Sequence, residues 1–255
     1  PDGLDAASWL IANETTGAVL AAHAPHSRQH PASLVKVLLA LVVLRDLRPD
    51  EVVVGGTEDT TYTGRVGIVP DAKYRVRDLV HALIVTQAND AASALARKLG
   101  GEQIAVERMN ELATKLGAMD TRAADATGLD APGMSTSAYD AALIYREAMR
   151  NAEFARASGS KSIVITAQGA RARKITREND NQLLDTYPGA TGGKAGLTDA
   201  AKSTFVGSAQ RNGTRLVVTL LRTEKTEDAP YDQAATLLDY GFTLASARTE
   251  PVGQL

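Results

Sequence analysis

The stretch at residues 204–221, TFVGSAQRNGTRLVVTLL, holds two runs of β-branched and aliphatic residues on either side of a short polar segment. The runs 204–209 and 215–221 predict strands, and Arg211-Asn212-Gly213 between them suits a tight turn. Because so short a turn joins only antiparallel neighbours, we expect these strands to pair in an antiparallel sheet.

Both ends of the chain supply further elements for this sheet. Residues 9–12 and 18–21 are short apolar runs that flank Asn-Glu-Thr-Thr-Gly, which predicts an opening hairpin. Residues 233–244 have the periodicity of an amphipathic helix. We therefore expect the N-terminal and C-terminal segments to share one sheet with a helix packed on it.

The middle of the chain is mainly helical in pattern. Helices are predicted at 34–44, at 79–99 with a break near 86–89, at 103–116 and at 137–149, and a strand is predicted at 162–166. No repeat or linker divides the 255 residues. The sequence thus predicts a single α/β domain over 1–255, in which an antiparallel sheet flanked by helices carries an inserted, mainly helical subdomain at about 50–160.

Composition excludes several classes of protein. The formal net charge of −2 gives no field that would collect nucleic acid. The absence of cysteine excludes disulfides, thiolate zinc sites and thiol nucleophiles, and no His-Glu-x-x-His motif is present, so we expect no metal and no cofactor. The longest aliphatic run, 37–44, is far shorter than the ~20 residues of a membrane-spanning helix.

Ser33-Leu34-Val35-Lys36 places a hydroxyl and an amine three residues apart, which on a helix brings them to one face. A serine nucleophile needs a base, and a lysine can serve once its pKa falls. The apolar run that follows Lys36 would supply the desolvation that disfavours the ammonium form. The alternative interpretation is a capping serine followed by a lysine whose head group reaches solvent.

Residues 192–197, GGKAGL, precede the predicted strand at 204–209. A phosphate-binding loop would need glycine where Pro188 stands and serine or threonine where Ala195 stands, so we expect no nucleotide. The segment can instead form an edge strand that presents Lys194 and Gly196 beside a serine nucleophile. A glycine-rich turn with a solvated lysine is the other interpretation.

Gln87-Ala88-Asn89 lies at the predicted helix break, where irregular backbone can direct side chains into a cleft. In order and spacing, the Ser33/Lys36, Gln87/Asn89 and Lys194/Gly196 pairs resemble the Ser-x-x-Lys, Ser-x-Asn and Lys-Thr-Gly elements of serine penicillin-binding proteins.

The resemblance is to the penicillin-binding domain of the low-molecular-mass D-alanyl-D-alanine carboxypeptidases and covers nearly the whole chain. The similar stretches are PAS at 31–33, VGIVP at 66–70, NDAA at 89–92, GLD at 128–130, STSAYD at 135–140, YPGATG at 187–192, VGSA at 206–209 and LLDYGF at 237–242. It implies the β-lactamase/transpeptidase-like fold, an extracytoplasmic location on the periplasmic or cell-wall side, and any leader or anchor outside this chain.

The resemblance also implies a role for each site residue. Ser33 would attack the terminal D-Ala–D-Ala bond of a peptidoglycan stem peptide, and Lys36 would accept its proton. Asn89 would bind the peptide amide and orient Lys36, and Lys194 would attract the substrate carboxylate. The backbone amides of Ser33 and Leu197 would hold the oxyanion. A β-lactam would acylate the same serine and stall there.

Two positions depart from the family pattern. Gln87 replaces the serine of Ser-x-Asn and cannot relay a proton as a hydroxyl can. Ala195 replaces the threonine of Lys-Thr-Gly and offers no hydroxyl to a carboxylate. These departures favour, as the alternative, a catalytically silent relative that binds stem peptides.

Other assignments are weaker. A β-lactamase is a less favoured alternative because no Glu-x-x-Leu-Asn segment is present to supply a deacylating glutamate. A Ser-His-Asp triad is disfavoured because none of the four histidines lies in a nucleophile-elbow context. A basic cluster near the predicted strand at 162–166 is interpreted as a solvated strand face; its members are Arg171, Arg173, Lys174 and Arg177.

Overall fold

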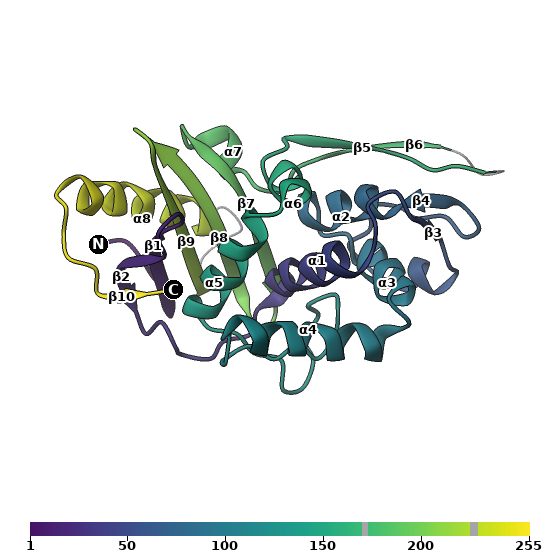
Figure 1. Ribbon diagram of the computed structural model, residues 1–255, viewed down its shortest axis with the longest axis horizontal. Helices are drawn as coiled ribbons and strands as arrows, with labels where there is room; N and C mark the ends of the chain where they lie inside the picture. Colours follow the sequence, from purple (N-terminus) through teal and green to yellow (C-terminus); the bar gives the residue numbers. More distant parts are fainter. Residues whose placement is uncertain (170–172, 225–228) are drawn as a thin grey trace.

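The computed structural model describes residues 1–169, 173–224 and 229–255 (Figure 1). Its main sheet is antiparallel throughout and has the strand order β10-β2-β1-β9-β8-β7. The strands are β1 Ser8–Asn13, β2 Ala18–His23, β7 Ala190–Thr198, β8 Lys202–Arg211, β9 Thr214–Thr223 and β10 Gly253–Gln254. The predicted antiparallel fold, built from both ends of the chain, is confirmed.

The hairpin β8–β9 forms as its sequence predicts. Arg211 pairs with Thr214, which leaves two residues for the turn. Asn212 and Gly213 have φ angles of 48° and 79°, the left-handed conformation that twisted two-residue hairpins require. Asparagine and glycine adopt it at low cost, so these residues set the register of the β8–β9 pair.

Alternate residues of β9 face opposite sides of the sheet, because side chains of a strand alternate. Leu216, Val218 and Leu220 pack in the cluster that includes helix α8 (Ala229–Ser246). Val217 and Leu221 pack in the larger cluster, whereas the short helix α7 (Leu183–Thr186) contributes Leu183 to the cluster of α8. Figure 1 shows α8 on one side of the sheet and α5 (Ala138–Met149) on the other.

Helix α1 (Val35–Asp46) lies at the centre of the larger cluster. Its sequence VKVLLALVVLRD is apolar on nearly every face, as expected for a helix surrounded by other elements. The helices of this region are α2 Val76–Val85, α3 Asn89–Lys98, α4 Glu102–Leu116 and α6 Ala152–Ser158. The predicted break between the two pieces of 79–99 is present, since α2 ends at Val85 and α3 begins at Asn89.

Two small sheets lie outside the main one. The strand predicted at 162–166 is β5 (Ser162–Thr166), which pairs with β6 (Lys174–Glu178). Strands β3 (Val52–Val54) and β4 (Lys73–Arg75) form the other pair. Residues 50–160 therefore contain short strands as well as helices, and their status as a subdomain of a single domain stays a prediction.

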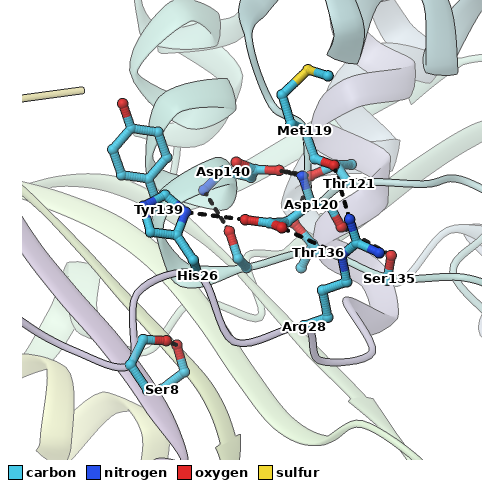
Figure 2. A network of polar contacts seen from close by, with 12 residues as sticks. Ser8, His26, Arg28, Met119, Asp120, Thr121, Ser135, Thr136, Tyr139 and Asp140 are labelled. Carbon is cyan, nitrogen blue, oxygen red and sulfur yellow. Dashed lines mark hydrogen bonds and ion pairs between the residues drawn. The ribbon is translucent and has the colours of Figure 1, made fainter.

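A polar network fixes the segment that leads to Ser33 (Figure 2). The Asp140 carboxylate, at the start of α5, accepts hydrogen bonds from the Asp120 amide (2.7 Å) and the Thr121 hydroxyl (2.8 Å). His26 contacts Asp120 at 3.1 Å. Because His26 precedes the nucleophile region by only a few residues, the network anchors that segment to α5.

Candidate active site

Ser33 lies in a short 3-10 helix, η1 (Ala32–Leu34), immediately before α1. Its Oγ is 2.8 Å from Nζ of Lys36. The predicted three-residue spacing therefore places the hydroxyl and the amine in hydrogen-bond contact. Lys36 is fully buried, and its Nζ also donates to the carbonyl oxygen of Thr127.

Burial lowers the pKa of Lys36 well below its ordinary value, because an ammonium group without water is unfavourable. The nearby charge of Lys194 lowers the pKa further, and the charge of Asp125 raises it. The predicted desolvation by the apolar helix is thus present. The environment favours the neutral amine, the form that can accept a proton from Ser33.

Lys194 lies on the edge strand β7 and is almost completely buried. Its Nζ donates to the carbonyl oxygen of Thr86 at 2.6 Å. Burial lowers the pKa of Lys194 to about 8, while the charge of Asp180 acts in the opposite direction. Lys194 is therefore a cation near neutral pH and loses its charge within a mildly alkaline range.

The helix break brings Asn89 and Gln87 to the same cleft. Asn89 donates from Nδ2 to the Thr63 carbonyl at 2.8 Å, and its backbone amide donates to Gly64 at 2.7 Å. The Asn89 Oδ1 is buried without a hydrogen-bond partner. Gln87 donates from Nε2 to the Ala195 carbonyl at 3.1 Å. Asn89 thus holds a free acceptor, while Gln87 bridges the helical region and β7.

Strand β7 approaches the nucleophile closely at Gly196. A Cβ at this position would lie 2.7 Å from the backbone nitrogen of Ser33 and 2.8 Å from the Ala32 Cβ. Real Cβ atoms do not approach other atoms so closely, so only glycine fits here. The next residue, Leu197, is 57% exposed.

These residues surround one cleft with a volume of about 580 Å³, which is within the size range of small-ligand sites. Its walls include Ser33, Gln87, Asn89, Ala195, Gly196 and Leu197. Lys36 and Lys194 lie beneath this lining, in contact with Ser33 and Thr86. The structure therefore brings all eight predicted site residues together, from segments as far apart as 33 and 197.

The sequence matches the family described as D-alanyl-D-alanine carboxypeptidase over residues 1–225. The chain belongs to this family. Its members are serine-type hydrolases, so the family resemblance and the enzyme class predicted from the sequence are confirmed.

Individual relatives agree with this assignment. The chain is 41% identical to D-alanyl-D-alanine carboxypeptidase DacB2 of Mycobacterium tuberculosis, over 96% of this chain and 84% of that protein. It is 34% identical to DacD of Salmonella typhimurium, over 94% of this chain and 64% of DacD. The chain thus spans just under two thirds of the length of DacD.

Solved structures share the fold. A crystal structure of D-alanyl-D-alanine carboxypeptidase from Mycobacterium tuberculosis matches with a TM-score of 0.92 and 41% identity, covering 100% of this chain and 96% of that one. The Streptomyces K15 DD-transpeptidase matches with a TM-score of 0.89 and 27% identity, covering 94% and 98%. The carboxypeptidase family and the transpeptidase therefore share one architecture.

No hydrogen bond joins Asn89 to Lys36 among the described residues. The Asn89 side-chain nitrogen donates to the Thr63 carbonyl, and Lys36 donates to Ser33 and Thr127. The expected role of Asn89 in orienting Lys36 therefore stays a prediction.

The described residues of the basic cluster are exposed on or beside β6, in agreement with the interpretation as a solvated strand face. Arg173 and Arg177 are exposed, yet they donate hydrogen bonds to the carbonyls of Gly67 and Val66. Lys174 is exposed on β6, and Arg171 lies outside the described residues. Two arginines of this cluster thus help to hold the loop at residues 66–68. The Asp90 carboxylate holds the same loop, because it accepts hydrogen bonds from the three backbone amides of residues 66–68.

Sequence reasoning missed the groups behind the lysines. Thr127 contributes its carbonyl to Lys36, and Asp125 and Asp180 contribute charges near Lys36 and Lys194. The only signal for Thr127 was its place directly before the family-like GLD stretch at 128–130.

Among the described residues, no cluster of three or more metal-ligating side chains occurs. No described helix has both the length and the apolar character to cross a membrane.

Proposed function

We propose that this chain is a serine D,D-carboxypeptidase that removes the terminal D-Ala from peptidoglycan stem pentapeptides through an acyl-enzyme on Ser33. The observation that carries the proposal is the 2.8 Å contact between Ser33 Oγ and the buried amine of Lys36. A serine hydroxyl becomes a nucleophile when an adjacent base takes its proton, and a desolvated lysine is such a base.

The first half of the reaction uses this pair directly. Ser33 Oγ forms a bond to the carbonyl carbon of the penultimate D-Ala while its proton passes to Lys36. The oxyanion lies against the backbone amides of Ser33 and Leu197. When the C–N bond to the terminal D-Ala breaks, Lys36 returns the proton to the leaving amine. Water then cleaves the ester, which restores the Ser33 hydroxyl and releases the shortened peptide.

Substrate binding uses the remaining groups of the cleft. The buried, unpartnered Oδ1 of Asn89 is a suitable acceptor for an amide N–H of the peptide. Lys194 supplies positive potential for the terminal carboxylate, and Ala195, Gly196 and Leu197 provide the strand along which the peptide lies. Since β-lactams carry a comparable acyl group and carboxylate, we expect them to acylate Ser33 and inhibit the enzyme.

Because the proposed substrate lies in peptidoglycan, we also propose that the protein acts outside the cytoplasm, on the periplasmic or cell-wall side, as a secreted hydrolase with a role in cell-wall metabolism and cell shape. The proposed reaction uses no nucleic acid, nucleotide or metal. The second candidate function is a silent stem-peptide-binding relative. It is favoured by the lack of a hydroxyl at Gln87 and Ala195 and by the bond from Gln87 to the Ala195 carbonyl.

The charge of Lys194 predicts that kcat/KM for D-Ala release falls at alkaline pH. Its pKa of about 8 means that the ammonium form dominates below that pH and is lost above it. We expect kcat/KM for D-Ala release to fall as pH rises through about 8. In Lys194→Arg, the guanidinium stays charged, so the falling limb should move beyond pH 10. The exposed Lys161→Arg serves as the control, and an unmoved limb in Lys194→Arg would assign the titration to another group.

Restoring the family residue at each of the two departing positions should raise kcat/KM for D-Ala release, but by unequal factors. Ala195→Thr adds one neutral hydrogen bond and should raise kcat/KM by about two- to thirteenfold. Gln87→Ser restores a hydroxyl that can relay a proton, and positioned acid–base groups contribute about 10²–10⁴-fold, so its gain should be larger. Steady-state D-Ala release from diacetyl-Lys-D-Ala-D-Ala measures both, with the exposed Gln103→Ser as control.

The double variant should be non-additive, because Gln87 contacts Ala195 directly. Lower activity in Gln87→Ser would show that the amide has its own use in this chain. A wild-type protein that is labelled by penicillin but releases no D-Ala would favour the silent relative.

A further inference from the structure

The turn at residues 125–128 is built around one carboxylate. Asp125 accepts hydrogen bonds from the backbone amides of Thr127 (2.8 Å) and Gly128 (2.6 Å) and from the Thr127 hydroxyl (3.1 Å). Glu102, at the start of α4, accepts one from the Ala126 amide at 2.7 Å. These contacts leave the turn little freedom to change its shape.

The same turn touches both members of the catalytic pair. The Thr127 carbonyl accepts a hydrogen bond from Lys36 Nζ. Gly128 has a φ of 83°, and a Cβ there would lie 2.2 Å from the Ala32 carbonyl oxygen and 3.0 Å from the Ser33 nitrogen. The position of the turn therefore determines where the Lys36 amine and the Ser33 backbone lie relative to each other.

Lys36 is influenced by two opposite charges in a buried environment. Lys194 acts from β7 and lowers the pKa of Lys36, whereas Asp125 acts from the turn and raises it. Asn89, from the break before α3, is neutral. The charge of Asp125 also acts on Glu102 and Tyr62. Burial is the main cause that raises the pKa of both groups, and Asp125 raises both further, while the Ala126 amide lowers the pKa of Glu102. Among the described residues, Asp125 is thus the carboxylate whose charge raises the pKa of Lys36.

We propose that Asp125 is a positioning residue for the acylation step, which fixes the Thr127 carbonyl against Lys36 and holds a negative charge near that amine. The inference rests on the proposed role of Lys36 as the base for Ser33. It separates two contributions of one side chain: the hydrogen bonds that shape the turn and the charge that acts on the amine.

Two substitutions distinguish these contributions. Asp125→Asn removes the charge but keeps an oxygen that accepts from the backbone amides, so the turn persists. The Lys36 ammonium then loses a stabilising charge, and the acid limb of the acylation rate should move roughly 0.5–1 pH unit lower. Its plateau rate should stay within about threefold of the wild type. Asp125→Ala also removes the acceptor, and displacement of the pair should lower acylation by about 10–100-fold at every pH.

The measurement is the rate of labelling by a fluorescent penicillin against pH, with Glu147→Gln as a charge-removing control on α5. The NMR titration of the Lys36 Cε resonance in the wild type and Asp125→Asn gives a second readout that needs no activity. A lower midpoint in Asp125→Asn supports the inference. An unmoved midpoint and acid limb, or unchanged acylation in Asp125→Ala, overturns it. Wild-type protein that penicillin does not label refutes the proposed function instead, and the titration still decides the role of Asp125.

Discussion

Replacing Lys36 with alanine is expected to lower the rate at which penicillin acylates Ser33 by about 10²–10⁴-fold, the usual contribution of a positioned base. The amine lies 2.8 Å from Ser33 Oγ, and the other hydrogen-bond partner of the amine, Thr127, offers a backbone carbonyl, which is too weak a base to take the serine proton. Without the amine, the serine proton has no acceptor in the pair. Stopped-flow or gel-based labelling near neutral pH gives the rate.

Lys36→Met is the matched variant, because its side chain fills similar space without an amine and should show the same loss. Thermal unfolding of both variants checks that the buried helix α1 still packs. Acylation at near the wild-type rate in either variant would remove Lys36 from the role of base.

The second large effect is expected at Gly196, where Gly196→Ala should lower acylation by about 10²–10³-fold. The added Cβ would meet the Ser33 nitrogen at 2.7 Å and the Thr204 Oγ1 at 2.7 Å. Strand β7 cannot move away freely, because Gly196 pairs with Thr204 on β8. The substitution therefore displaces the backbone amide that we assign to the oxyanion.

Gly253→Ala in strand β10 is the control, since a Cβ there meets only Val19 atoms at 3.8 Å. It should leave acylation unchanged. The rate of penicillin labelling and the release of D-Ala should fall together in Gly196→Ala. If both stay at the wild-type level while the protein remains folded, the backbone of Ser33 is not part of the oxyanion site.

The sequence predicted those features that depend on neighbours along the chain. The β8–β9 hairpin follows from two apolar runs and an Asn-Gly turn, and the break before Asn89 follows from the loss of helical periodicity. Strands β3 and β4 have three residues each, too few for a periodic pattern to show. Strand β6, KITRE, is exposed apart from Ile175, so its basic residues gave no clear strand signal.

The candidate residues were predicted better than their partners. Ser33 and Lys36 are three positions apart, and their contact follows from helical geometry. The bond from Gln87 to the Ala195 carbonyl joins residues 108 positions apart, and Lys36 to Thr127 joins residues 91 apart. These partners are backbone carbonyls, which every residue carries, so no residue type marks them in the sequence.

The most direct test of the central claim is intact-protein mass spectrometry after incubation with benzylpenicillin, followed by peptide mapping. The account predicts one adduct with the full mass of the antibiotic, located on the peptide that contains Ser33 and absent from Ser33→Ala. An adduct on a different residue, or none on a folded wild-type protein, would contradict the assignment of Ser33 as the nucleophile.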